Sequence, residues 1–153
     1  MRAVIQRVKY AGVLINKAEE RKIKDGFLVL LGVGADDTES EASLMAEKIA
    51  NLRVFSDADD KLNLSLLDVD GEAMVISNFT LYADCSHGRR PSFFESAKPP
   101  KANDLYELFV QRLKDCGVKN VQTGEFGADM EVTLCNDGPI TIIIDSEDIK
   151  KRK

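Results

Sequence analysis

The first half of the chain alternates apolar and polar residues in a way that predicts strands around one amphipathic helix. Two short runs with strand-like alternation, residues 3–8 and 12–15, precede the more continuously apolar residues 27–33, which predict a buried strand. Polar residues then introduce a helix, with Thr38 and Glu41 at the spacing of a capping box. The apolar face of this helix is formed by Ala42, Met45, Ile49 and Leu52.

The middle of the chain predicts two more extended segments, a long loop and a second helix. A polar turn at residues 57–61 is followed by extended residues 62–67 and 73–81, of which the second segment is apolar enough to be central. Residues 83–101 are rich in turn formers and predict a long loop. Gly117 marks the end of the second helix. The apolar face of that helix is formed by Ala102, Leu105, Phe109, Leu113 and Cys116.

Two segments near the C-terminus also predict strands. Residues 130–135 alternate apolar and polar side chains, and residues 140–144 are strongly β-branched. Asn136-Asp137-Gly138-Pro139 separates them, and a simple hairpin turn is one interpretation of it. The other is a turn that presents carbonyl oxygens, because proline lacks an N–H donor and a Gly-Pro bond adopts the cis form at modest cost. Such acceptors suit an ammonium group.

The order of these elements predicts an α+β fold. Strands outnumber helices and do not follow a regular βαβ alternation, so we expect strongly curved, antiparallel, barrel-like sheets with two main helices. With 153 residues, 44% of them hydrophobic, the chain is large enough for one core. We assign residues 1–149 to a single domain and residues 150–153 to a basic C-terminal tail. Gly32-x-Gly34 follows a strand but lacks the third glycine of a dinucleotide-binding fingerprint.

The charge of the chain limits how it could hold a nucleic acid. The formal net charge is −5, whereas proteins that bind nucleic acid mainly through its phosphates are usually basic. Extended wrapping of RNA is therefore excluded, and an RNA partner would be held at a small part, such as an end. Local basic positions are Arg89, Arg90, Lys98, Lys101 and the tail residues 150–153, for which a solvated terminus is the simpler interpretation.

Cysteine and histidine usage argues against a metal centre. The three cysteines are widely spaced and form no Cys-x-x-Cys pair, so we expect free thiols, and one histidine cannot supply a histidine-rich site. We predict no structural zinc. No apolar stretch approaches the roughly 20 residues needed to cross a bilayer, and we expect a cytoplasmic protein without a membrane partner.

The residues that could carry chemistry fall in two places. Ser77, Asn78 and Thr80 bring three polar side chains to the end of an apolar segment; they form either the polar outer face of a strand or a strand end that displays hydroxyl and N–H groups into a pocket. His87, the single histidine, and Cys85 in the long loop are candidates for a histidine- or thiol-based hydrolase, although an exposed loop histidine and an uninvolved thiol are the simpler interpretations. No Gly-x-Ser-x-Gly sequence accompanies them.

With these motifs the sequence resembles the D-aminoacyl-tRNA deacylase family, also called D-tyrosyl-tRNA deacylases. The likeness covers nearly the whole chain and rests on several spaced motifs in the same order. Besides the residues named above, these are residues 2–8, 28–33, 53–57, Arg90-Pro91-Ser92-Phe93, Thr123-Gly124, Phe126-Gly127-Ala128-Asp129-Met130 and Asn136-Asp137-Gly138-Pro139. Where the family has Ser-Gln-Phe-Thr-Leu, this chain has Asn78 in place of glutamine, which keeps the amide and shortens its reach by one methylene.

The resemblance implies hydrolysis of the ester between a D-amino acid and the terminal adenosine at the 3′ end of tRNA, without metal or organic cofactor. N–H groups around Phe79 and Thr80 would stabilise the oxyanion, and the Thr80 hydroxyl would act as nucleophile or, as we favour, orient water. Ser77 is placed with them in catalysis. Phe79 and Phe126 would stack on adenine. Further substrate-binding assignments are Asn78, Phe126 and Met130.

The resemblance also implies a homodimer. In it the Gly138-Pro139 turn, with its peptide bond cis, would reach into the pocket of the other subunit. Its carbonyls would bind the α-amino group and exclude L side chains, while D-residues and glycine would be tolerated. Arg7 would fix the orientation of this turn.

Two rival functions remain open. One is an RNA-end or nucleotide-binding module without turnover, which would retain charged tRNA without hydrolysing it. The other is a general small-ester hydrolase built around His87 or Cys85, which would lose all activity if His87 were replaced by alanine.

Overall fold

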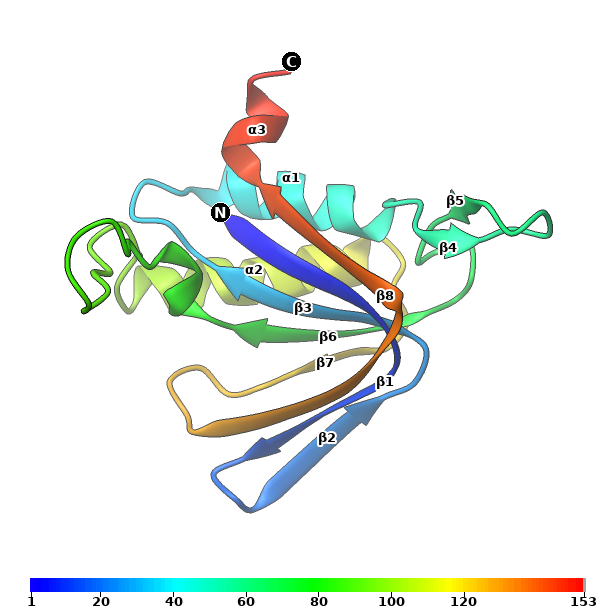
Figure 1. Ribbon diagram of the computed structural model, residues 1–153, viewed down its shortest axis with the longest axis horizontal. Coiled ribbons are helices and arrows are strands. Elements are labelled where there is room, and N and C mark those ends of the chain that lie inside the picture. Colours follow the sequence, from blue (N-terminus) through cyan, green and yellow to red (C-terminus); the bar gives the residue numbers. More distant parts are fainter. Residues whose placement is uncertain (153) are drawn as a thin grey trace.

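In a computed structural model, which describes residues 1–152, the chain forms one strongly curved sheet flanked by helices (Figure 1). The sheet contains β1, β2, β3, β6, β7 and β8, while β4 and β5 form a separate hairpin. The bounds of the strands are β1 Arg2–Ile15, β2 Glu19–Ile23, β3 Gly26–Gly32, β4 Phe55–Ser56, β5 Leu62–Leu64, β6 Glu72–Ser77, β7 Val121–Thr123 and β8 Met130–Asp145. The helices are α1 Glu39–Ala50, the 3₁₀ helix η1 Phe79–Tyr82, α2 Lys101–Asp115 and α3 Ser146–Lys150.

Strand β1 is the centre of the curved sheet. The two short runs expected at its position are one continuous strand of 14 residues. β8 pairs with β1 along nearly its full length, while the other edge of β1 is shared by β3 and, farther along, β2. The first part of β1 thus pairs with β3 and its last part with β2, while β8 follows both parts. With this pairing the sheet curls into the nearly closed, barrel-like shape visible in Figure 1.

The sheet is mixed, which corrects the expectation of antiparallel strands. β3 pairs with β6 in parallel, and β6 pairs with β7 in parallel. The chain passes through α1 between β3 and β6 and through α2 between β6 and β7. A crossover of this kind brings the chain back to the same end of the sheet, so the next strand runs in the same direction.

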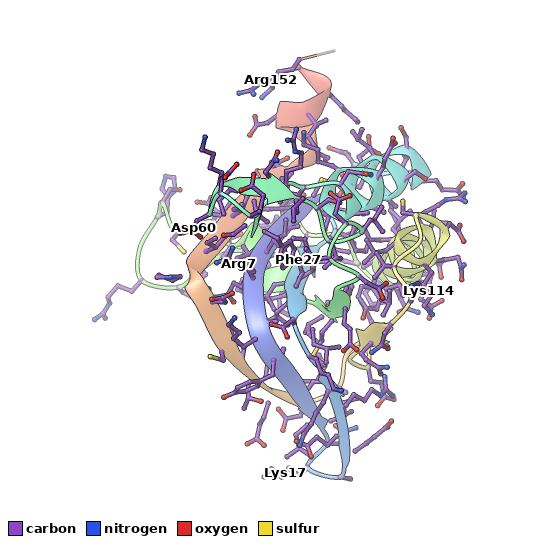
Figure 2. All side chains as sticks on the ribbon, turned by 90° about the vertical axis from the view of Figure 1, so that its right-hand side faces the viewer. Arg7, Lys17, Phe27, Asp60, Lys114 and Arg152 are labelled. Atoms are coloured by element: carbon purple, nitrogen blue, oxygen red, sulfur yellow. The ribbon has the colours of Figure 1, made fainter. Side chains whose placement is uncertain are left out.

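The main core lies between the sheet and the helices α1 and α2. Phe27 and Ile5 from the sheet are almost fully buried, and Met45 and Phe109 pack against them from the helices. Figure 2 shows Phe27 in this interior, whereas Lys17 and Lys114 lie at the surface. A second buried cluster on the other side of the sheet contains Val8, Ala11, Val13, Ile15, Ile23, Leu28, Met74 and Ile76.

The predicted helices are confirmed with their end signals. The side chain of Thr38 accepts from the backbone of Ser40 at 3.3 Å, and Glu41 accepts from the backbone N–H of Thr38 at 2.6 Å. These bonds satisfy donors that the first turn of α1 leaves free. Gly117 follows α2 with a φ of +109°, a conformation that favours glycine.

The C-terminal segment contains a short helix that the sequence pattern did not predict. Asp145 caps α3 by accepting from the backbone N–H of Glu147 at 3.0 Å. Lys150 belongs to α3 and forms an ion pair with Glu41 on α1. Of the expected basic tail, Lys153 lies outside the described residues. Within residues 1–152, no helix is long and apolar enough to cross a membrane.

Candidate active site

A pocket of about 550 Å³ lies where β6 ends. Its walls come from the end of β3, the end of β6, the loop before α2, the first turn of α2 and the connection between β7 and β8. The lining residues are Val33, Ser77, Asn78, Phe79, Phe93, Ser96, Ala97, Lys98, Pro99, Ala102, Phe126, Gly127, Ala128 and Met130. The pocket thus gathers residues that are distant in sequence, including Ser77, Asn78, Phe79, Phe126 and Met130 of the predicted site.

The chain turns sharply at this strand end. β6 was expected to continue to residue 81, but it stops at Ser77 and the next residues form η1. A side chain at Gly32 would lie 3.1 Å from the carbonyl oxygen of Asn78 and from the Cβ of Leu81. The glycine therefore lets the turn of η1 pack directly on β3, and the interpretation of these residues as the outer face of a strand is wrong.

The start of η1 presents hydrogen-bonding groups next to the pocket. The N–H groups of Phe79 and Thr80 begin the helix, so they have no acceptor within it. The hydroxyl of Thr80 donates to the amide oxygen of Asn78 at 2.5 Å. Since that bond uses the hydroxyl proton, the remaining role of the Thr80 oxygen is to accept a hydrogen bond. Thr80 itself is exposed and lies outside the pocket lining.

Aromatic side chains form two sides of the pocket. Phe79 is 55% exposed, and its ring meets that of Phe93 edge to face at a centroid distance of 5.1 Å. Phe126 lies 6.4 Å from Tyr106, ring centroid to ring centroid. Tyr106 donates to the carbonyl of Val75 at 2.7 Å, and burial raises the pKa of its hydroxyl, so it stays neutral and fixes this wall.

Residues 136–139 do not form a hairpin turn. Both halves of β8 pair with β1, with Thr141 opposite Gln6 and Asn136 opposite Val8. Residues 137–140 therefore bulge from β8 opposite Arg7 alone, and the strand continues beyond them in its original direction. The Gly138–Pro139 peptide bond is cis, as the family resemblance implied, and both residues are exposed. We call residues 136–140 the Gly-Pro bulge.

The side chain of Asn136 closes the Gly-Pro bulge. Its amide oxygen accepts from the backbone N–H of Ile140 at 2.7 Å, and its amide nitrogen donates to the carbonyl of Ile140 at 3.1 Å. The same nitrogen donates to the Thr141 hydroxyl at 3.0 Å. The amide thus replaces the backbone pairing that the bulge interrupts. Sequence reasoning assigned no role to Asn136, although its place at the start of the motif was visible.

Arg7 holds the other side of the Gly-Pro bulge. Its side chain is only 11% exposed and forms an ion pair with the Asp137 carboxylate at 3.4 Å. The guanidinium donates to the carbonyl of Asp137 at 3.0 Å and to the carbonyl of Val54 at 2.8 Å. Figure 2 labels Arg7 on β1, beside β8. Arg7 therefore contacts the bulge as the resemblance implied, but neither Arg7 nor the Gly138–Pro139 pair lines the pocket of its own chain.

The remaining candidate nucleophiles lie away from the pocket lining. Cys85 and His87 are exposed in the loop before α2, and the ring nitrogen Nδ1 of His87 lies 2.7 Å from the Ser86 hydroxyl. Sequence reasoning gave no role to Phe93 and treated Lys98 only as a local basic position. The position of Phe93 in the Arg90-Pro91-Ser92-Phe93 motif was the available signal. Across residues 1–152, no three side chains of the types His, Cys, Asp and Glu come together in a metal-binding arrangement.

The chain matches known proteins over nearly its whole length. Residues 4–145 match the protein family described as D-Tyr-tRNA(Tyr) deacylase. A D-aminoacyl-tRNA deacylase of Thermosipho africanus is 55% identical over 149 residues, which cover 97% of this chain and 99% of the relative. A D-aminoacyl-tRNA deacylase of Clostridioides difficile is 53% identical over 146 residues, which cover 95% of this chain and 97% of the relative.

Solved structures share the fold over nearly the whole chain. A protein named c-Myc DNA Unwinding Element Binding Protein superposes with a TM-score of 0.88 at 36% identity, over 95% of this chain and 98% of its own. A probable eukaryotic D-amino acid tRNA deacylase superposes with a TM-score of 0.83 over 94% and 98% of the two chains; at 16% identity this likeness concerns the fold alone. From the family match and the close relatives, this chain belongs to the D-Tyr-tRNA(Tyr) deacylase family.

Proposed function

We propose that this protein hydrolyses the ester bond of D-aminoacyl-tRNA, releasing the D-amino acid and the tRNA. The observation that carries the proposal is the pocket at the end of β6, in a chain that matches the family from residue 4 to residue 145. The pocket joins aromatic walls to free backbone donors at the start of η1. An aminoacyl ester on a terminal adenosine needs both, because it has a base to stack and a carbonyl that becomes an oxyanion.

In the reaction, water adds to the ester carbonyl carbon and its proton passes to the leaving ribose oxygen as the carbon–oxygen bond breaks. The N–H groups of Phe79 and Thr80 bind the oxyanion that forms on the way. Thr80 orients the water rather than attacking the ester itself, since its proton is held by the Asn78 amide oxygen and no general base adjoins it. Ser77 completes the polar end of β6 beside them.

The adenine and the aminoacyl group occupy the apolar part of the same pocket. Phe79 and Phe126 flank the adenine by stacking, which suits recognition of an RNA end by an acidic protein. Met130 borders the aminoacyl group. Asn78, shorter than the usual glutamine, is turned toward the Thr80 hydroxyl, so contacts that a longer side chain would make with the substrate are lost here.

We propose further that the active unit is a homodimer. The Gly-Pro bulge of one subunit enters the pocket of the other, where its carbonyls receive the α-amino group of the substrate and leave no room for an L side chain. Glycine has no side chain to reject, so glycyl-tRNA is also a substrate. In support, Gly138 and Pro139 at the tip of the bulge are exposed and do not line the pocket at the end of β6 in their own chain.

An apolar row on the sheet supports the same assembly. Val4 pairs with Leu30 on one side and with Ile143 on the other, so these side chains lie on the face opposite the buried Ala3 and Ile5. Ile143 is 71% exposed. Val4 and Leu30 are half-buried, with Leu30 packed beside the second buried cluster, and an apolar row that ends in an exposed residue is typical of an interface between subunits.

The test is hydrolysis of D-tyrosyl-tRNA, L-tyrosyl-tRNA and glycyl-tRNA by the purified protein, with and without EDTA. We expect release from the D-tyrosyl and glycyl substrates alone, at rates that EDTA leaves unchanged, because the proposed chemistry uses no metal or organic cofactor. We place the reaction in the cytoplasm, where tRNA is charged. Binding of charged tRNA without release would favour the RNA-end binding module, and release from all three substrates would refute chiral selection.

A further inference from the structure

The loop between η1 and α2 carries two arginines that the proposed reaction does not use. We propose that Arg89 and Arg90 form a phosphate clamp that holds the RNA backbone next to the 3′ end lying in the pocket. The inference rests on the proposed function in one respect, which is that the ligand is a tRNA. It goes further by naming the surface that contacts the RNA beyond its terminal nucleotide.

The loop holds these arginines away from the body of the protein. Asp84 and Ser92 pair through two backbone hydrogen bonds of 2.8 and 2.9 Å, which close the base of the loop. Gly88 turns the chain with a φ of +66°. Hydrogen bonds from Ser86 hold the pKa of the Asp84 carboxyl below its usual range, so this carboxylate stays charged and serves the base of the loop. Every residue from 85 to 91 is exposed.

The two guanidinium groups also lack the carboxylate partners that four of the other arginines have. Arg2, Arg21 and Arg112 each form an ion pair with a carboxylate within 4 Å. Arg89 and Arg90 form none with any residue that the structure describes. Guanidinium groups are weakly hydrated and match the geometry of phosphate oxygens, so two adjacent free arginines form a ready site for an RNA backbone.

The position of the loop relates the clamp to the pocket. Phe93 lines the pocket and contacts Phe79, while Ser92 beside it closes the base of the loop. Arg90 precedes Phe93 by three residues, a reach of at most about 10 Å along the chain. Figure 1 shows this loop at the far left, beyond the ends of β3 and β6. When the 3′ end of the RNA is held at Phe79, the backbone that precedes this end therefore passes Arg89 and Arg90.

The net charge of the whole chain limits where an RNA backbone can approach the protein. A net charge of −5 repels RNA from the protein as a whole, so a local pair of positive charges decides where the backbone can approach. An acidic protein surface would satisfy the same arginines, but the neighbouring pocket is the proposed site of an RNA end. We therefore favour RNA phosphates, contacted without regard to base sequence.

The clamp can be tested by binding, independently of hydrolysis. We would measure the dissociation constant of uncharged tRNA over a range of salt concentrations for the wild type and for R89A/R90A. Loss of two phosphate contacts should weaken binding about tenfold or more at low salt and make the salt dependence shallower by about two ion equivalents. The matched control is K24A/K61A, which removes two exposed lysines and should leave affinity nearly unchanged. They belong to the β2–β3 turn and the β4–β5 hairpin, which Figure 1 shows on the side opposite the loop between η1 and α2.

A second measurement separates the clamp from the chemistry. With D-tyrosyl-adenosine, which lacks the rest of the RNA, R89A/R90A should match the wild type, while kcat/KM for D-tyrosyl-tRNA falls. R89K/R90K, which retains both charges, should recover most of the tRNA affinity. Unchanged tRNA binding in R89A/R90A, or an equal loss in K24A/K61A, would overturn the clamp. Failure of the wild type to hydrolyse either ester would instead overturn the proposed function, whatever the binding shows.

Discussion

The two parts of the proposed active site, the pocket at the end of β6 and the Gly-Pro bulge of β8, are held in different ways. At the β6 end of the pocket, Phe79 is 55% exposed and the Thr80 side chain is bonded to Asn78 alone among the described side chains. The bulge is fixed from both sides, by the amide of Asn136 and the guanidinium of Arg7. The Gly-Pro bulge is thus the part that side-chain hydrogen bonds tie down more fully.

This difference fits a division of roles. Stacking of a base on an aromatic ring tolerates small adjustments of side chains, because every base presents a flat face, whereas the proposed oxyanion donors are backbone groups held by η1. Rejection of one enantiomer requires a surface that does not yield, since a yielding carbonyl would make room for the wrong side chain. The side-chain hydrogen bonds are therefore concentrated on the Gly-Pro bulge, which must exclude L side chains. The pocket is left open to the substrate and to the bulge of the partner subunit.

The largest effect on activity is expected when the pocket is blocked in one subunit and the Gly-Pro bulge is distorted in the other. A128W fills the pocket, and G138A places a Cβ 2.8 Å from the backbone nitrogen of Ile140 and so distorts the bulge. Both homodimers should be inactive. A heterodimer of the two has one site with both parts intact, so its activity should return to about half that of the wild type.

The heterodimer is isolated with two different C-terminal tags, because the α-amino group of Met1 is buried against Asp37 at 2.6 Å. Release of D-tyrosine is then measured for each species, with circular dichroism to verify folding. If the bulge served the pocket of its own subunit, each half of the heterodimer would keep one defect. An inactive, folded heterodimer would therefore end the idea of a shared site.

The next largest effect is expected at Arg7. R7A leaves the carbonyls of Asp137 and Val54 without their donor and Asp137 without its closest cation. The displaced bulge should cost on the order of a hundredfold in D-tyrosyl-tRNA hydrolysis, and the free energy of unfolding should fall by about 2–3 kcal/mol. R7K keeps the positive charge but lacks the planar guanidinium that donates to both carbonyls. It should therefore recover the free energy of unfolding better than the hydrolytic activity. A variant as active as the wild type would show that the bulge needs no anchoring.

A smaller effect should follow from N136A. The amide that closes the bulge is lost, so the D-specific rate should drop about tenfold, in line with the loss of hydrogen bonds worth roughly 1 kcal/mol each. Hydrolysis of L-tyrosyl-tRNA should rise relative to it. T141V removes only the hydroxyl acceptor of the same amide and serves as the control. An unchanged ratio of D to L rates would mean that Asn136 stabilises the strand but does not set the chirality.

On the pocket side, F79A should weaken substrate binding without altering chirality. Loss of one stacking partner, worth about 1–3 kcal/mol, should raise KM about fivefold or more while the ratio of D to L rates stays constant. F94A is the matched control, because Phe94 is 90% exposed and lies outside the pocket lining. The comparison is made on D-tyrosyl-adenosine. A change in chiral ratio for F79A would contradict the division between pocket and bulge.

Local signals in the sequence were sufficient for the two long helices α1 and α2, but not for η1, α3 or the pairing of the sheet. Thr38, Glu41 and Gly117 mark helix ends through contacts within a few residues, and the structure confirms them. The parallel pairing of β3 with β6 depends on a crossover of the chain, which periodicity does not record. The end of β6 at Ser77 depends on close approach to Gly32, a contact across strands.

The candidate site shows the same limit. Ser77, Asn78 and Phe79 are contiguous and were found as a motif, and the fold brings Phe126 and Met130 to the same pocket. The role of residues 136–139 could not be read locally, because a hairpin turn and a bulge have the same composition. Only the register of β8 against β1 distinguishes the two.

The smallest effect is expected at the two residues of the rival hydrolase. His87 contacts the Ser86 hydroxyl at 2.7 Å, and both His87 and Cys85 are exposed outside the pocket lining. Since neither residue lines the pocket, H87A and C85A should each change kcat/KM for D-tyrosyl-adenosine by less than about twofold. D-tyrosyl-adenosine lacks the rest of the RNA, so the measurement does not depend on contacts between the loop and the RNA backbone. A loss of several orders of magnitude in H87A would move the chemistry from the end of β6 to the loop, and the contrast between an exposed pocket and a firmly hydrogen-bonded bulge would no longer describe the active site.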